Sequence, residues 1–291
     1  MSRKVESVIK AHHQLEGGGF VVRRPFPTGA LDLVDPFLLL DEMGPADYGP
    51  GEAKGAPDHP HRGFETVTYM LEGEFQHEDS AGHRGAIAPG DVQWMTAGRG
   101  IVHSEMPTEA IRERGGRIHG FQVWVNLPAR DKMMMPRYQE VPASRIPEGT
   151  SLDGKARVRV IAGEALGVQA VIDTRTPIVY QDWSLEPGSV VEQPLAEGHN
   201  AFVYVFSGRA EVGTDRRAIS DGELALLGPG QGVRLAVPAD VAGGARLLLL
   251  AGQPLRERVA RYGPFVMNTE AEIRQAMSDY RSGRLGEIQR A

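Results

Sequence analysis

The sequence predicts a mostly β protein that folds as two domains, and three observations support this. Short apolar or alternating runs bounded by Gly, Pro and Asp recur along the 291 residues, as in "ETVTYMLEGEF", "HGFQVWVNL" and "AFVYVFSGRAEV". Many short strands at such spacing are typical of a sandwich or a barrel. The chain is long enough for two domains of ordinary size, each with its own core. Finally, two of the strand-like segments look like copies of each other.

The two similar segments are residues 67–82 and 201–215. Each contains a Tyr followed by two apolar residues, one further residue and a Gly. Further along, "IAPGDVQWMTAG" resembles "ISDGELALLGPG", with the same spacing between two glycines. We interpret the pattern as an internal duplication of one β unit, with evenly spaced glycines in an all-β protein as the alternative explanation.

Residues 127–149 separate the two halves. This stretch has four prolines and little periodicity, which is typical of a linker or strap. We therefore expect an N-terminal metal-binding domain at residues 1–135 and a C-terminal domain without metal ligands at residues 136–291.

The end of the chain predicts a helix. Thr269 is followed three residues later by Glu272, which is the signature of a capping box. Ile273, Met277 and Tyr280 then follow at helical spacing. The helix should pack this apolar stripe against one of the two domains.

Composition excludes several function classes. A net charge of −6 and the lack of a long Lys/Arg cluster give no reason to bind nucleic acid directly. Without cysteine, any metal must be held by His, Asp or Glu. The first residues lack an apolar signal core, and no run of about 18 apolar residues occurs, so we expect a cytoplasmic protein that makes no membrane contact.

Two pairs of residues at i, i+2 spacing suggest a metal site. His59 and His61 precede a strand-like run, and alternate residues of a strand share one face. His103 and Glu105 form a second pair in "GIVHSEMP". An isolated H-x-H is more often a surface or core pair, but the second pair favours a metal site. Three imidazoles and one carboxylate can converge on one ion and leave positions open for a substrate or dioxygen.

Other polar residues lie near these pairs. Glu65 has the same parity as His59 and His61, so it is either a further ligand, a residue supporting the ligands, or a salt-bridging strand carboxylate. We expect His77, His83 and His119 to be hydrogen-bonded surface or supporting residues rather than ligands.

The duplication provides an internal comparison for the candidate ligands. When the two copies are matched at their glycines, the corresponding positions are Pro194, Ala196, Leu235 and Val237. None of these side chains can bind a metal. We therefore expect one ion per chain, in the N-terminal half.

Several long motifs identify a family. "HPHRGFETVTYMLEGEFQHEDS", "GDVQWMTAGRGIVHSEMP" and "GPFVMNTEAEIRQAMSDYRSGRLG" resemble the pirin family of the cupin superfamily, and the resemblance extends from Gly19 to Gly286. It implies an all-β fold with two cupin-type β-barrel (jelly-roll) domains and a C-terminal helix. It also implies one Fe2+ per chain held by His59, His61, His103 and Glu105. The same ligand set suits copper, nickel or zinc.

The resemblance implies two classes of function. One is quercetin 2,3-dioxygenase-type cleavage of a flavonol by O2 with release of CO, in which Glu105 could act as both ligand and catalytic base. The other is an iron-containing, redox-sensing protein that binds a protein partner and co-regulates transcription or a metabolic enzyme. If the protein is a flavonol dioxygenase, the candidate walls of its substrate pocket are Phe64, Met70, Trp94, Phe121 and Trp124. Each of these side chains is equally suited to be a core residue.

Overall fold

The computed structural model of the chain describes residues 1–290. Contacts divide these residues into two compact units, each built from three stretches of chain. The first unit comprises residues 13–24, 37–143 and 255–290, and the second comprises residues 1–12, 25–36 and 144–254. This division differs from the expected ranges 1–135 and 136–291 at both ends of the chain, because residues 1–12 belong to the second unit and residues from 255 onward to the first.

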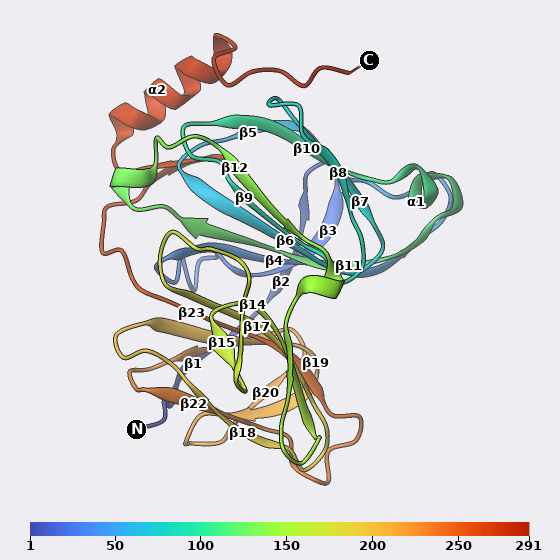
Figure 1. Cartoon of the computed structure of the whole chain (residues 1–291), viewed down its shortest axis with the longest axis vertical. Helices are drawn as coiled ribbons and strands as arrows, with labels where there is room; N and C mark the ends of the chain where they lie inside the picture. Colours follow the sequence, from blue (N-terminus) through green and yellow to red (C-terminus); the bar gives the residue numbers. More distant parts are fainter. Residues whose placement is uncertain (291) are drawn as a thin grey trace. The chain divides into compact units, whose positions relative to one another are not determined.

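The first unit contains a seven-stranded and a four-stranded sheet (Figure 1). In order across the larger sheet, the strands are β12 (Arg137–Val141), β9 (Val92–Thr96), β6 (Phe64–Glu72), β11 (Gly116–Asn126), β4 (Phe37–Tyr48), β3 (Phe20–Phe26) and β2 (His12–Glu16). The smaller sheet consists of β5 (Ala56–His61), β10 (Ile101–Pro107), β7 (Phe75–Asp79) and β8 (Arg84–Ile87). The short strands β24 (Ala260–Tyr262) and β25 (Phe265–Met267) pair with each other.

The second unit is built around one ten-stranded sheet. Its main path is β1 (Val5–Lys10), β21 (Glu223–Leu227), β19 (Asn200–Val212), β23 (Ala245–Gly252), β17 (Ile178–Leu185), β14 (Ala156–Ala162) and β13 (Glu148–Thr150). Off this path lie β18 (Val190–Pro194), β20 (Arg217–Ser220) and β22 (Gly232–Ala236). A small hairpin is formed by β15 (Glu164–Ala165) and β16 (Val168–Gln169).

The order of strands supports the internal duplication. β6, which carries the first copied segment, lies between β9 and β11, and β19, which carries the second, lies between β21 and β23. The prediction of a mostly β fold with a C-terminal helix is confirmed. The described strands do not close into continuous barrels, so each predicted barrel is open: the first unit has two sheets of seven and four strands, and the second has one sheet of ten strands.

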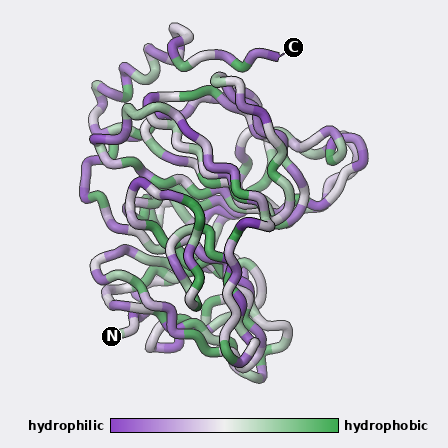
Figure 2. Tube along the Cα trace, in the orientation of Figure 1, coloured by the Kyte–Doolittle hydropathy of each residue, from purple (hydrophilic) through white to green (hydrophobic). Residues whose placement is uncertain are grey.

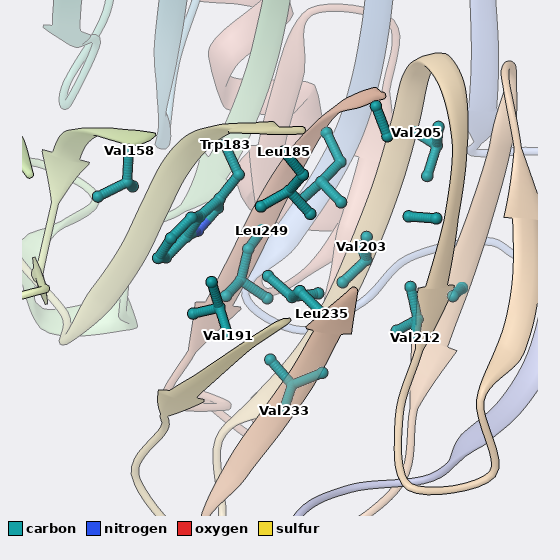
Figure 3. Close-up of a cluster of buried hydrophobic side chains, with 14 of the residues drawn as sticks. Val158, Trp183, Leu185, Val191, Val203, Val205, Val212, Val233, Leu235 and Leu249 are labelled. Carbon is teal, nitrogen blue, oxygen red and sulfur yellow. The ribbon is translucent and has the colours of Figure 1, made fainter. Parts of the chain in front are cut away.

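Apolar side chains fill the interior of the second unit. Figure 3 shows Val191, Leu235 and Leu249 pointing toward one another from different strands. Leu235 and Val237, the positions matched to His103 and Glu105, are both buried in this cluster. Hydrophobic and hydrophilic stretches alternate along the chain (Figure 2). A packed hydrocarbon core occupies the place where the first unit carries its polar site.

The proline-rich stretch at residues 127–149 is more ordered than a linker. It contains the 3₁₀ turns η1 (Ala129–Asp131) and η2 (Ala143–Arg145). Between them, β12 pairs antiparallel with β9 and extends the larger sheet of the first unit. The absence of a regular apolar pattern in β12 reflects its place at the sheet edge, where much of its surface remains partly exposed.

The C-terminal helix α2 (Glu270–Arg281) packs on the first unit and is drawn in red in Figure 1. Thr269 and Glu272 form the predicted capping box. Ile273 is buried in a cluster with Val102 of β10, whereas Tyr280 is 41% exposed, so the stripe is buried in part. The other helix is the short α1 (Glu109–Arg114). In the described chain, we find no helix with the length and apolar character needed to span a membrane.

Candidate metal centre

The candidate ligands come from two neighbouring strands of the four-stranded sheet. β10 pairs antiparallel with β5, and His103 lies directly opposite His59. Directly opposed residues of such a pair present their side chains on one face, and His61 shares that face with His59. The centroid of the His103 ring lies 4.4 Å from that of the His59 ring and 4.8 Å from that of the His61 ring. These three residues form the histidine triad.

The turn after β5 depends on a glycine. Gly63 has a φ of +88°, and a Cβ at this position would clash with the carbonyl oxygen of Val266. Only glycine combines this backbone conformation with so close an approach. In the local sequence "HPHRG", β5 therefore ends at His61, and only Arg62 and Gly63 separate it from the start of β6.

The ring nitrogens of the triad converge. One potential ligand nitrogen from each ring lies within 4.8 Å of the other two. Nδ1 of His59 lies 2.7 Å from the carbonyl oxygen of Pro57, so this nitrogen carries the proton and donates it. Nε2 of His59 then keeps its lone pair and faces Nε2 of His61 at 3.0 Å.

The remaining triad nitrogens indicate that the group can hold a cation. Both ring nitrogens of His103 are buried, and residues 1–290 offer them no hydrogen-bond partner. Buried nitrogen atoms normally have partners. A metal ion among the rings would satisfy the lone pairs that face one another, and uncharged imidazoles are common ligands of transition metals.

Burial keeps two of the rings uncharged. The pKa of His61 is well below its usual value of 6.5 because of burial and, to a smaller extent, the neighbouring His59. The pKa of His103 is also well below 6.5, again because of burial first and then the nearby histidines. A metal ligand must be unprotonated, so both rings are in the form that binds metal.

Glu105 lies outside the group of nitrogens within 4.8 Å of one another, and its carboxylate has two other partners. The hydroxyl of Thr68 donates to Oε1 at 2.8 Å, and the amide of Gln122 donates to Oε2 at 2.9 Å. A register shift between β10 and β5 separates Glu105 from His103 in the pairing. Such bulges change where a side chain points.

A cavity of about 490 Å³ opens beside the triad, within the usual range for small-molecule sites. Glu105, Gln122, His59 and His61 line it. Its apolar walls are Phe20, Leu39, Met43, Phe75 and Trp124. Its charged lining residues include Glu16, Arg24, Asp41, Asp58 and Arg261.

The charged part of the cavity wall contains a buried ion pair. Arg24 donates Nε to Oδ1 of Asp41 at 2.6 Å and also contacts Glu16 at 2.8 Å. Burial raises the pKa of Asp41 to about 6 against the opposing effect of Arg24. Arg24 itself remains charged, since its carboxylate partners raise its pKa despite burial.

The other predicted polar residues are not part of the triad. Glu65 accepts a hydrogen bond from Thr96 at 2.6 Å, because the turn at Gly63 breaks the parity that linked it to β5. His119 contacts Glu42 at 2.8 Å, and His83 contacts Asp79 at 2.9 Å. His77 is buried, with its ring 5.3 Å from that of His103.

Of the five side chains predicted as candidate pocket walls, one lines the cavity. Trp124 does so, and Phe64 packs behind it with its ring 4.4 Å away and also 5.0 Å from the ring of His61. Met70, Trp94 and Phe121 are fully buried and do not line the cavity. These three are core residues.

Thr68 and Gln122 are the site residues that the sequence did not reveal. Both lie on interior strands, where a polar side chain among apolar neighbours is unusual. For Gln122, that irregularity in "FQVWV" was the available signal.

The chain resembles known protein families and solved structures. The family described as Pirin matches residues 19–125, and the Pirin C-terminal cupin domain matches residues 180–286. A pirin-like protein of Solanum lycopersicum is 47% identical over 285 residues, or 98% of this chain and 93% of the relative. The pirin of Homo sapiens is 45% identical over 288 residues, or 98% and 94%. A solved quercetin 2,3-dioxygenase from Acinetobacter baumannii has a TM-score of 0.92 at 37% identity and covers 99% of this chain and 100% of its own.

Proposed function

The chain belongs to the pirin family and has two cupin domains, and we propose that it is a metal-dependent dioxygenase. The proposed reaction is quercetin 2,3-dioxygenase-type cleavage of a flavonol by O2 with release of CO. The observation that carries the proposal is the convergence of three histidines beside a cavity that is also lined by a buried carboxylate. The similarity to the Acinetobacter enzyme supports the choice of substrate class.

The proposed metal is Fe2+, one per chain. The histidine triad would hold it, with Glu105 as a fourth ligand, and copper, nickel and zinc suit the same donors. A redox-capable ion bound there supplies the activation of dioxygen and a positive charge for the substrate oxygen atoms. The apolar interior of the second unit supports a single site.

The cavity walls can position a flat aromatic substrate. Phe20, Leu39 and Phe75 present apolar surface, and the indole of Trp124 presents a ring next to His61, with the two centroids 5.3 Å apart. Aromatic rings favour stacked or edge-to-face contacts at such distances. These walls would orient the substrate and exclude water from the reacting atoms.

Glu105 is the proposed catalytic base. A flavonol must lose the proton of its 3-hydroxyl to react, and Glu105 is a carboxylate that lines the cavity beside the triad. Thr68 and Gln122 donate hydrogen bonds to the carboxylate and thereby hold it at the cavity wall. Transfer of the proton to Glu105 would leave the substrate as an anion.

Turnover with purified protein tests the proposal. Protein loaded with Fe2+ would be mixed with quercetin under O2, and the loss of the flavonol absorption and the formation of CO would be measured per bound ion. We expect turnover in the parent and none in His103→Ala. His13→Ala, which removes an exposed histidine outside the triad, is the matched control and should retain the parent's rate.

An iron-loaded parent that consumes neither quercetin nor O2 would refute the dioxygenase proposal. The redox-sensing, partner-binding function would then be the better explanation of the same metal centre. The protein partner and the cytoplasmic location stay predictions from the sequence.

A further inference from the structure

We propose that Gln122 is a positioning residue that acts on the metal centre through Glu105. Its side chain links the indole of Trp124 to the carboxylate of Glu105 within the wall of the cavity. The inference rests on the proposed metal centre, but it does not depend on the identity of the substrate.

The indole of Trp124 is held on several sides. Its ring packs at 4.4 Å from that of Phe64 and at 5.3 Å from that of His61. The guanidinium carbon of Arg261 lies 5.0 Å from the centre of the indole, within the range of a cation–π contact. These contacts fix the direction in which the indole N–H points.

The indole in turn fixes the orientation of the amide. Gln122 and Trp124 are two residues apart on β11 and therefore share one face of the sheet. Nε1 of Trp124 can only donate, and it lies 3.3 Å from Oε1 of Gln122. The amide NH2 must then face the other way, toward Oε2 of Glu105 at 2.9 Å.

The carboxylate of Glu105 is thereby restrained at both oxygens. Thr68 on β6 donates to one oxygen, and Gln122 on β11 donates to the other. The two strands are adjacent and paired, so the two donors lie at fixed positions. Groups that hydrogen-bond to a metal ligand orient it, and their removal typically lowers metal affinity by about 10–100-fold.

A second Gln-x-Trp pair in the other unit provides a matched control. Nε1 of Trp183 donates to Oε1 of Gln181 at 2.9 Å, which is the same arrangement. There the amide donates to the backbone oxygen of Glu164 at 2.8 Å, so its partner is a carbonyl instead of a carboxylate. Replacing this glutamine removes the same kind of contacts without touching the metal centre.

The test measures the binding of Co2+ to the full-length apo protein by calorimetry, in the parent, Gln122→Met, Glu105→Gln and the double variant. Methionine keeps the length of the glutamine side chain but cannot donate. We expect Gln122→Met to lower the affinity about tenfold or more and to change the visible absorption of bound Co2+. The same substitution in the Glu105→Gln background should lower the affinity less than threefold, and Gln181→Met should leave it unchanged.

Three results would overturn the inference. They are an affinity of Gln122→Met equal to or above that of the parent, an equal loss in the Glu105→Gln background, or an equal loss in Gln181→Met. If Gln122→Met does not fold, Trp124→Phe keeps the ring and removes the N–H, and it should also lower the affinity only when Glu105 is present. None of these measurements requires turnover. If the effect of Gln122→Met depends on Glu105 but the protein does not act on quercetin, the dioxygenase proposal is refuted and this inference stands.

Discussion

The substitution Asp279→Asn should destabilise the protein without removing its metal. Asp279 lies on α2 and is the carboxylate through which the helix contacts the turn after β5. Arg62, the residue directly after His61, donates Nη1 to Oδ2 of Asp279 at 2.8 Å. Arg284 and Gln275 donate to Oδ1, each at 2.7 Å. The asparagine is nearly isosteric but carries no charge, so it weakens all three contacts.

The pKa of Asp279 gives the size of the effect. Burial raises this pKa, but the hydrogen bonds from Arg62, Arg284 and Gln275 outweigh burial and lower it from 3.8 to about 2. One pKa unit corresponds to about 1.4 kcal/mol, so the charged carboxylate contributes about 2 kcal/mol of stability at neutral pH. Because the pKa is lower in the folded state, this contribution is present above pH 3.8 and is lost as the pH falls toward 2.

Equilibrium unfolding in urea would measure the difference, with tryptophan fluorescence as the signal. Asp279→Asn should be about 2 kcal/mol less stable than the parent at pH 7, and the difference should shrink below about pH 4. Asp32→Asn, at an exposed aspartate, is the control and should match the parent. Equal stability of Asp279→Asn and the parent at pH 7 would show that the contacts with Arg62 do not hold the helix. Loss of bound metal in the variant would show that the helix also shapes the triad.

Four further outcomes are expected. Deleting the chain from Thr269 onward should lower the melting temperature and leave the metal bound, since α2 packs its apolar residues on the first unit; an unchanged melting temperature would contradict this. Burial lowers the pKa of Lys132 from 10.5 to about 8, so the folded state binds fewer protons than the unfolded state between these two pH values. The stability of the parent relative to Lys132→Met should therefore increase by up to about 3 kcal/mol as the pH rises from 8 to 10.5. Urea unfolding would measure this increase. The double variant His59→Ala/His61→Ala should bind no metal, whereas the parent should approach one ion per chain by elemental analysis; retained metal would remove the triad from consideration. Glu105→Gln should keep much of its metal, yet its kcat/KM for quercetin per bound ion should fall about 100-fold or more, and a rate equal to the parent's would exclude Glu105 as the base.

Local backbone geometry explains what could be predicted from the sequence. The i, i+2 spacing of His59 and His61 places both rings on one face of any strand, whatever the rest of the fold. The capping box of Thr269 and Glu272 likewise involves only neighbouring residues, and it begins α2 as expected. The strand runs and their repetition reflect the period of side-chain burial, so the mostly β fold with two similar units followed from the pattern.

Tertiary structure decided which distant surfaces meet. An apolar stripe shows that a helix is half-buried, but it does not say which unit it covers, and α2 returns to the first unit through Arg62 and Val102. Gln122 and Thr68 reach Glu105 together only because β6 pairs with β11 in one register, and a shift of one residue would turn one of the two side chains to the opposite face. Register depends on the packing of whole strands, so the sequence by itself determined the histidines and the fold class, whereas the contacts that hold Glu105 exist only in the assembled sheets.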